Sequence, residues 1–89
     1  MKILYSSRFL QKYGRLPQEV KEKAEKKEEI FRKNPFDERL KIHKLHGRMN
    51  EFWAFSVDIK YRIILKFEDS DKVRFYAIGG SEGGQLFNT

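Results

Sequence analysis

Residues 53–78 read WAFSVDIKYRIILKFEDSDKVRFYAI and contain three successive runs in which apolar and polar side chains alternate. Alternation with a period of two is typical of a strand that has one buried face and one exposed face. Two short polar segments, 58–60 and 69–71, separate the runs, and aspartate and serine favour turns at such positions. The stretch therefore predicts three antiparallel strands joined by tight turns.

The same alternation assigns the strands two different faces. One set of side chains is apolar, as Phe55, Ile63 and Phe75 illustrate, and we expect it to pack against the rest of the chain. The opposite face then carries Ser56, Asp58, Lys60, Arg62, Lys66, Arg74 and Tyr76. Folding of such a sheet does not require several cations on one face, so this face is a candidate binding surface.

The chain before these strands predicts one strand and two helices. Residues 2–5 (KILY) fit a short strand, and Ser6 or Ser7 can cap a helix that ends at Gly14, where glycine would supply a left-handed cap. A strongly amphipathic second helix opens at Leu16–Pro17, with proline at its first position, and stops at Asn34–Pro35. Its glutamates and lysines lie three and four residues apart, which indicates a solvated face. We therefore expect an α+β fold of order β-α-α-β-β-β, with the helix hairpin on one face of a small, mainly antiparallel sheet.

Residues 36–48 (FDERLKIHKLHGR) connect the second helix to the strands and show no sustained period. Leu40, Ile42 and Leu45 are expected to hold this connection to the core, and Gly47 to turn the chain into the first strand of the meander. Both histidines of the protein lie here, among lysines and arginines. The side chains expected to point outward are Arg39, Lys41, His43, Lys44, His46 and Arg48.

Composition narrows the possible functions. The 89 residues fit one small domain, 1–89, and the absence of cysteine excludes disulfides and thiolate metal sites. The apolar run at the N-terminus is too short for a signal peptide, and no segment is long enough to span a membrane, so we expect a cytoplasmic protein. The formal net charge of +6 favours a polyanion or an acidic protein as partner, although solvated lysines alone would give the same charge.

Several kinds of chemistry lack support in the residues. His43 and His46 are three apart, but no further ligands stand at a recognisable metal-site spacing, so no metal or cofactor is expected. The glycines of 79–84 lack the lysine and the serine or threonine of a phosphate loop, and no nucleophile-elbow pattern is present. Metal-free RNA cleavage remains open. In that reaction a 2′-hydroxyl attacks its neighbouring phosphate, which needs a base, an acid and cations beside the charged phosphorus.

The residue types for these roles are present. A histidine titrates near neutral pH and serves as base or acid, whereas arginine offers a planar fork of donors to phosphate oxygens. The candidates for catalysis are Arg62, His43, Lys44 and His46. The candidates for RNA binding are Lys41, Arg48, Lys60, Lys66, Arg74 and Tyr76, the tyrosine by stacking on a base. Composition permits this chemistry but does not select it.

Four segments, in their order and spacing, resemble the RelE/ParE superfamily of type II toxins, and specifically its mRNA-cleaving RelE, YafQ, YoeB and HigB branch. They are Phe9–Tyr13–Leu16–Pro17, residues 34–47 (NPFDERLKIHKLHG), residues 52–63 (FWAFSVDIKYRI) and residues 75–80 (FYAIGG). The resemblance covers nearly the whole chain and implies the β-α-α-β-β-β fold. It further implies metal-independent cleavage of mRNA in the A site of the ribosome, against the 16S rRNA, and inhibition by an acidic antitoxin.

The resemblance assigns roles unevenly. Arg62 matches the phosphate-stabilising arginine of the branch, and His43 looks like the histidine of the YafQ-like segment, here His43–Lys44–Leu45–His46–Gly47. The chain departs from the family at residues 53–57, where RelE-like proteins carry lysines, and at Ser81, where many relatives have a late histidine. The proton-transfer pair is then either incomplete or completed by another residue, such as His46 or Glu82.

These departures leave two other functions open. Proteins of the ParE branch have a similar fold and inhibit DNA gyrase without cleaving RNA. The lack of a histidine at position 81 is compatible with that activity. A degenerate homologue that only binds its antitoxin would show neither activity. A gyrase supercoiling assay and an mRNA cleavage assay separate the three hypotheses.

Overall fold

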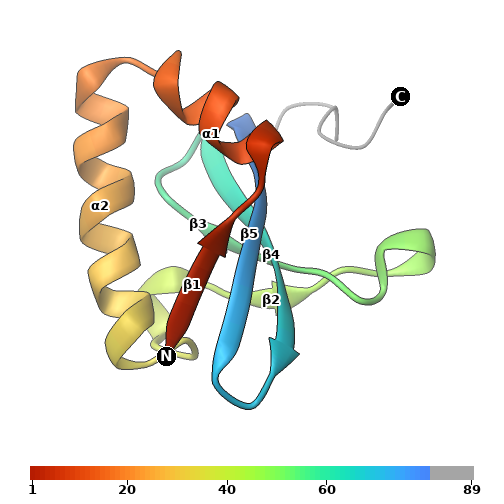
Figure 1. The fold of residues 1–89 in the computed structure, drawn as a ribbon. Helices are drawn as coiled ribbons and strands as arrows, with labels where there is room; N and C mark the ends of the chain where they lie inside the picture. Colours follow the sequence, from red (N-terminus) through yellow and green to blue (C-terminus); the bar gives the residue numbers. More distant parts are fainter. Residues whose placement is uncertain (81–89) are drawn as a thin grey trace.

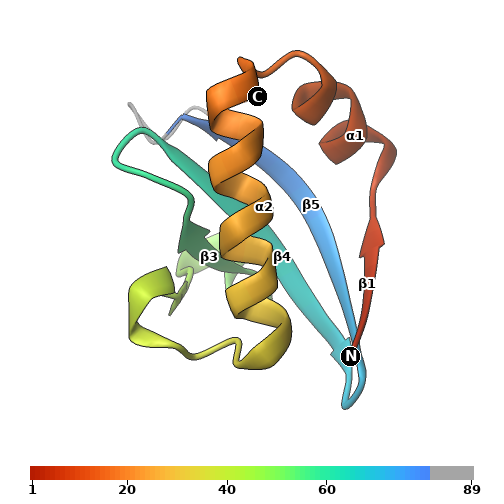
Figure 2. The same ribbon diagram turned by 90° about the vertical axis from the view of Figure 1, so that its left-hand side faces the viewer.

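A computed structural model of the chain describes residues 1–80. Its elements are β1 (Lys2–Tyr5), α1 (Ser7–Gly14), α2 (Gln18–Lys33), η1 (Glu38–Leu40), β2 (His43–Lys44), η2 (Gly47–Met49), β3 (Trp53–Ser56), β4 (Tyr61–Asp69) and β5 (Lys72–Gly80). The strands form one sheet in the order β1-β5-β4-β3-β2, in which β1 runs parallel to β5 and all other pairs are antiparallel. Both α-helices cover the same face of this sheet (Figures 1 and 2). The predicted α+β class is confirmed.

The strand β2 was not predicted, because two residues are too short to show a period. It pairs with β3 through His43 opposite Ala54 and Lys44 opposite Trp53. Lys41, just before it, has a left-handed backbone (φ 52°), which turns the chain after η1 and aims it along the edge of the sheet. The connection expected to be irregular therefore carries one of its two histidines, His43, on an edge strand.

The main core lies between the helices and the sheet. Phe31 of α2 is fully buried and packs on Phe55 of β3, with ring centroids 5.2 Å apart, and on Phe75 of β5 at 5.5 Å. Val20 and Ala24 share the buried face of α2 with Phe31, as its amphipathic pattern predicted. Each such aromatic or branched side chain contributes about 1.5–3 kcal/mol by leaving water. The helices are therefore held to the sheet mainly by apolar contacts.

The helix ends partly follow the predictions. Ser6 caps α1, since its Oγ accepts a hydrogen bond from the amide of Phe9 at 3.0 Å. Gly14 is the last helical residue but has no left-handed backbone, and the helix closes through an αR cap at Arg15, so that expectation was wrong. Pro17 is the N-cap of α2 rather than its first residue. Asn34 ends α2 in an extended conformation, as a residue before proline should.

A second, smaller apolar cluster lies on the opposite face of the sheet. Ala54, Ile64 and Ala77 are buried there, and Leu45 and Phe52 pack against them. The prediction assigned this face mainly polar side chains, and the cluster corrects it, because Leu45 and Phe52, which precede and follow η2 in the sequence, pack against these buried residues. Figure 1 shows η2 projecting on the side of the sheet away from α2.

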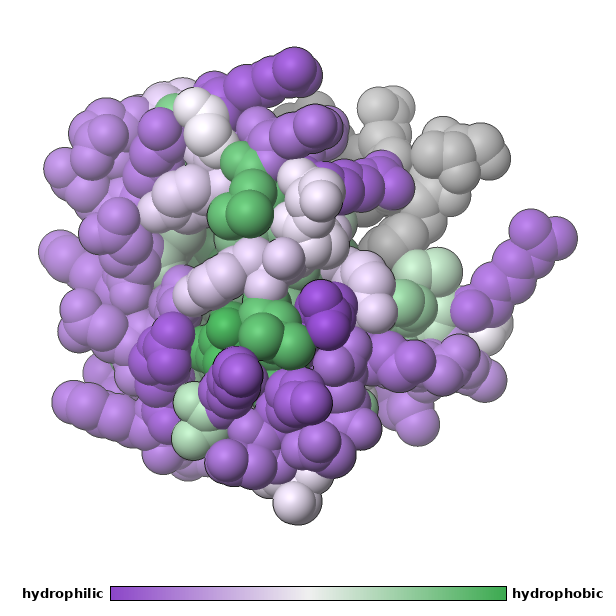
Figure 3. Space-filling model, in the orientation of Figure 1, coloured by the Kyte–Doolittle hydropathy of each residue, from purple (hydrophilic) through white to green (hydrophobic). Residues whose placement is uncertain are grey.

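The face of the molecule seen in Figure 3 is mostly polar. In the view of Figure 3, hydrophilic residues dominate, and strongly hydrophobic surface is limited to small areas, the larger of them over β1 and β5. Within residues 1–80, no helix is both long and apolar enough to cross a membrane.

Candidate functional site

The face of the sheet away from the helices, called the open face here, carries the side chains of interest. The register places Arg62 of β4 opposite Ser56 of β3 and Gly79 of β5. Two residues further along β4, Ile64 lies between Ala54 and Ala77, and His43 of β2 lies opposite Ala54. Because side chains alternate along each strand, all of these share one face. The open face is defined by His43, Ala54, Ser56, Arg62, Ile64, Lys66, Arg74, Tyr76, Ala77 and Gly79.

Of the lysines and arginines of the open face, Arg62 is the one that forms no ion pair within residues 1–80. It is half-buried, and no ion pair joins its guanidinium to another residue of 1–80. Its two cross-strand neighbours, Ser56 and Gly79, are small and uncharged, so they neither neutralise it nor fill the space around it. An arginine in such a position presents its fork of donors to an incoming anion.

His43 lies on the same face, at the edge of the sheet. Its Nδ1 lies 3.2 Å from the carbonyl oxygen of Lys41. A carbonyl oxygen only accepts, so this hydrogen bond requires the proton on Nδ1 and leaves the lone pair of Nε2 free to take a proton. Two strand spacings and two residues separate His43 from Arg62, roughly 12 Å between their backbones. A phosphate bound between the two side chains is within reach of both.

The structure does not bring the other predicted catalytic residues to this place. Lys44 follows His43 on β2 and pairs with Trp53, so its side chain belongs to the helix-covered side of the sheet. His46 is exposed, precedes η2 as its N-cap and lies outside the sheet. Ser81 and Glu82, which the sequence singled out, lie outside the described residues.

Two of the predicted RNA-binding cations are already paired. Lys66 Nζ lies 3.1 Å from Glu51 Oε1, and Arg74 Nε lies 2.8 Å from Glu68 Oε2. The glutamates raise the pKa of both cations, and the Arg74 guanidinium lowers the pKa of Glu68. An anion that binds Lys66 or Arg74 must therefore compete with a carboxylate. The sequence could not show these ion pairs, because each pair forms only when the folded chain brings its two residues together.

Asp58 and Lys60 were expected on the open face, and the structure places both beside the start of α2 instead. Asp58 Oδ2 lies 3.5 Å from Lys23 Nζ of α2, and Asp58 Oδ1 accepts from the amides of Lys60 and Tyr61 at 2.8 Å each. Burial raises the pKa of Asp58, but these amides and Lys23 outweigh it, and the net pKa is lowered. The carboxylate thus closes the β3–β4 turn against the helix.

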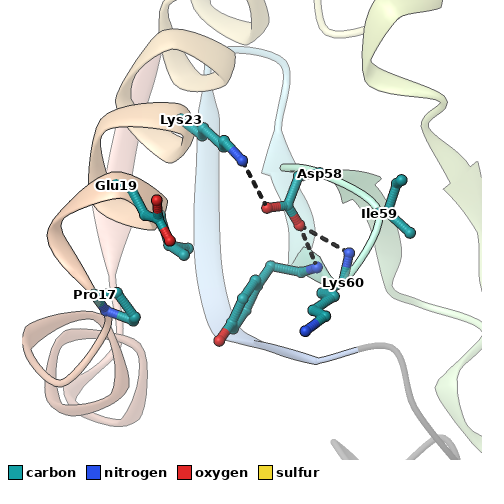
Figure 4. Close-up of a pocket in the computed structure, with 8 residues that line it drawn as sticks. Pro17, Glu19, Lys23, Asp58, Ile59 and Lys60 are labelled. Atoms are coloured by element: carbon teal, nitrogen blue, oxygen red, sulfur yellow. Dashed lines mark hydrogen bonds and ion pairs between the residues drawn. The ribbon is translucent and has the colours of Figure 1, made fainter.

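That turn borders a shallow hollow of about 430 Å³ at the start of α2 (Figure 4). Pro17 and Glu19 come from the helix side, and Asp58, Ile59 and Lys60 from the turn. Lys60 therefore lines a different surface from Arg62, although it precedes it by only two residues. Lys41 and Arg48 are exposed on either side of β2, close in sequence to His43.

The described residues contain no group of three or more histidine, cysteine or carboxylate side chains that could hold a metal ion.

Phe52 is a residue of the open face that the sequence did not single out. This residue packs on the buried cluster of the open face, and its ring centroid lies 5.0 Å from that of Tyr76. Its position one residue before Trp53, in the alternating run, was the signal that could have placed it on this face.

No protein-family model matches the chain, and no curated protein matches its sequence. Its fold, however, is similar to solved toxin structures over nearly the whole length. A YoeB/ParE toxin from Agrobacterium tumefaciens superposes with a TM-score of 0.77 at 18% identity, covering 90% of this chain and 98% of that one. YafQ from Escherichia coli strain BL21(DE3) gives 0.75 at 23% identity, with 97% of each chain covered.

YoeB in a heterotetrameric YoeB–YefM toxin–antitoxin complex from Staphylococcus aureus gives a TM-score of 0.74 at 12% identity, covering 89% of this chain and 94% of that one. Identities this low establish a common fold and leave the activity open. The chain therefore has the fold of the RelE/ParE toxins, as the resemblance in its sequence predicted.

Proposed function

We propose that this chain is the toxin of a type II toxin–antitoxin system and that it cleaves mRNA on the ribosome, using its own side chains rather than a bound metal. The similarity of fold to YafQ and YoeB supports the class. The observation that supports the activity is the position of Arg62 on the open face, half-buried, without an ion pair in residues 1–80 and between two small neighbours.

The proposed chemistry follows from what these groups can do. In cleavage by the 2′-hydroxyl, negative charge builds up on the phosphorus oxygens, and Arg62 would donate to them through its planar fork. The Nε2 lone pair of His43 would accept the hydroxyl proton or, once protonated, give a proton to the leaving 5′-oxygen. Within residues 1–80, His43 is the one histidine of the open face, so we assign one of the two proton transfers to it.

Charge supports the proposed partners. The net charge of +6 favours association with rRNA and mRNA, and also with an acidic antitoxin that would compete for the same cations. YoeB was solved in a complex with an antitoxin, and we extend that kind of partner to this chain. Both the mRNA and the antitoxin place the proposed activity in the cytoplasm.

Induced expression in a bacterial host tests the proposal. We expect translation and growth to stop, and primer extension on cellular mRNA to show new 5′ ends within coding sequence. The Arg62→Ala variant, expressed to the same level, should restore growth and remove those ends. Normal growth with abundant folded wild-type protein would contradict the proposal.

Inhibition of DNA gyrase is the second candidate, since the fold is also similar to that of a YoeB/ParE toxin from Agrobacterium tumefaciens, with a TM-score of 0.77, and the ParE branch inhibits gyrase. A supercoiling assay with purified gyrase distinguishes the two activities. Gyrase inhibition without new mRNA ends would favour this candidate, and unaffected supercoiling would eliminate it. A chain that binds an antitoxin but shows neither activity would be a degenerate homologue.

A further inference from the structure

An aromatic pair crosses the middle of the open face. The rings of Phe52 and Tyr76 meet edge to face, with centroids 5.0 Å apart and planes at 83°. Phe52 precedes β3 and Tyr76 belongs to β5, so the two rings meet above β4, which runs between those strands. Both residues are half-buried, so neither is fully covered by the rest of the chain.

The register irregularity in β5 brings Tyr76 to this position. Ile64 pairs with Ala77 and Leu65 pairs with Phe75, so Tyr76 is the extra residue of a bulge between them. The hydroxyl of Ser6 also donates to the carbonyl oxygen of Tyr76 at 2.8 Å. The backbone of Tyr76 is thus fixed from the side of α1, which limits how far its ring can move.

Charge surrounds this pair on two sides. Lys66 and Arg74 face each other on β4 and β5 beyond the rings, each with its own glutamate partner. On the other side, Arg62 lies two to four residues back along β4, which is about 7–13 Å at the rise of a strand. The aromatic rings therefore lie between an available arginine and a pair of compensated cations.

We propose that Phe52 and Tyr76 form a nucleobase-stacking site, which holds the base of a nucleotide next to the phosphate bound by Arg62. This rests on the proposed function, because it assigns the position of the RNA strand on the same face. In an edge-to-face pair, the ring that offers its edge keeps both of its own faces free of the other ring. A base of single-stranded RNA can stack on such a face, as bases do on aromatic platforms in many RNA-binding proteins.

The rings also cover the buried cluster of Ile64, Ala54 and Ala77, and a stacking role must be separated from that covering role. Leucine at position 52 keeps an apolar cover over Ile64 but removes the π surface. Phenylalanine at position 76 keeps the ring and removes only the hydroxyl. The two substitutions therefore make different predictions for base stacking while disturbing the cluster little.

Binding of a short 2′-O-methyl RNA, which lacks the attacking hydroxyl, provides the test with the full chain. Fluorescence anisotropy is measured with the intact oligonucleotide and with a series in which each base in turn is removed to give an abasic position. For wild-type protein, we expect one position at which loss of the base weakens binding about 5- to 140-fold. Phe52→Leu should bind the intact RNA correspondingly more weakly and be insensitive to that abasic position. Tyr76→Phe, which keeps the ring, should still lose affinity at that abasic position.

Phe36→Leu is the matched control, because Phe36 is also an exposed aromatic (58% exposed) but packs on Trp53 and Phe67 on the helix-covered side of the sheet. Its abasic profile should equal that of wild type. An identical abasic profile for wild type and Phe52→Leu would overturn the proposal, as would an equal loss in Phe36→Leu. Urea unfolding of each variant shows that a loss of binding is not a loss of folding.

Ribosome-dependent cleavage of mRNA provides a second test of the stacking site. Phe52→Leu should relax the base preference next to the cut site, read by primer extension, while Arg62→Ala abolishes cutting at every sequence. Absence of RNA binding by the free protein together with an unchanged base preference in Phe52→Leu would refute the stacking site. Failure of the proposed function gives a different result, since wild-type protein would then cut no mRNA whatever stands at position 52.

Discussion

The substitution Arg62→Gln tests the proposed site most directly. The Arg62 side chain is half-buried on β4, and no ion pair holds it to another residue of 1–80. Its removal breaks no ion pair within residues 1–80, so we expect the free energy of unfolding to change by less than about 0.5 kcal/mol, as for most surface substitutions. Glutamine keeps the aliphatic stem that covers the strand and removes only the charge and the fork of donors.

The effect on cleavage should be much larger. One preorganised donor aimed at the charge of a transition state is typically worth about 2.7–4 kcal/mol, which is about 100- to 1,000-fold in rate. Single-turnover cleavage of ribosome-bound mRNA by purified protein, with the toxin in excess, measures this rate without product release. Arg62→Lys keeps the charge but not the planar fork, so we expect it to recover about tenfold over glutamine.

Arg74→Gln is the matched control on the same face. Arg74 is compensated by Glu68 at 2.8 Å, so its loss removes little available positive charge, and we expect cleavage to fall by less than about tenfold. A cleavage rate for Arg62→Gln within about threefold of wild type, or less than about 0.7 kcal/mol, would refute the reasoning. Equal losses in Arg62→Gln and Arg74→Gln would also refute it, because pairing would then make no difference.

Three further outcomes follow from the described contacts. Ile64→Ala should lower the free energy of unfolding by about 2–5 kcal/mol in urea, because Ile64 is fully buried although it belongs to the open face; a loss below about 1 kcal/mol would mean that the face is not covered. Arg39, through its hydrogen bonds, lowers the pKa of Asp37 to about 2, below the usual value of about 4. The stability that this pair contributes is therefore complete above pH 4 and is lost as the pH falls toward 2. An NMR titration of the Asp37 carboxyl with its midpoint near pH 4 would contradict this. Nitrogen shifts of neutral His43 should show the proton on Nδ1, bonded to the carbonyl of Lys41, and a dominant Nε2–H form would contradict that assignment.

The local elements were largely predictable from the sequence because their signals are short in range. Alternation over residues 53–78 specified three strands, and Asn34–Pro35 specified the end of α2, since the residue before proline avoids helical conformation. Ser6 was one of two predicted caps for α1 and is the one used. The errors also have local causes. A two-residue strand has no period, so β2 was missed, and Gly14 was given a left-handed backbone that the chain adopts instead at Lys41 and Gly47.

Arg62 was named as a candidate from the sequence alone, and so was the face that it occupies, since alternation along a strand assigns faces without reference to any other element. Its availability was decided by tertiary structure. Only the register of β3, β4 and β5 places Ser56 and Gly79 beside Arg62. Alternation placed Lys66 and Arg74 on the same face as Arg62. In the fold, each of these two cations forms an ion pair with a glutamate.

The same division applies to the rest of the site. The sequence placed both histidines in one basic segment, but the pairing of β2 with β3 turns His43 toward the open face and Lys44 away from it. Alternation along the strand assigned Asp58 to the open face, but the β3–β4 turn places its carboxylate beside Lys23 of α2 instead. Alternation along a chain specifies which side of its own strand a side chain occupies. Which groups meet there depends on contacts between residues far apart in sequence, and only the folded chain makes those.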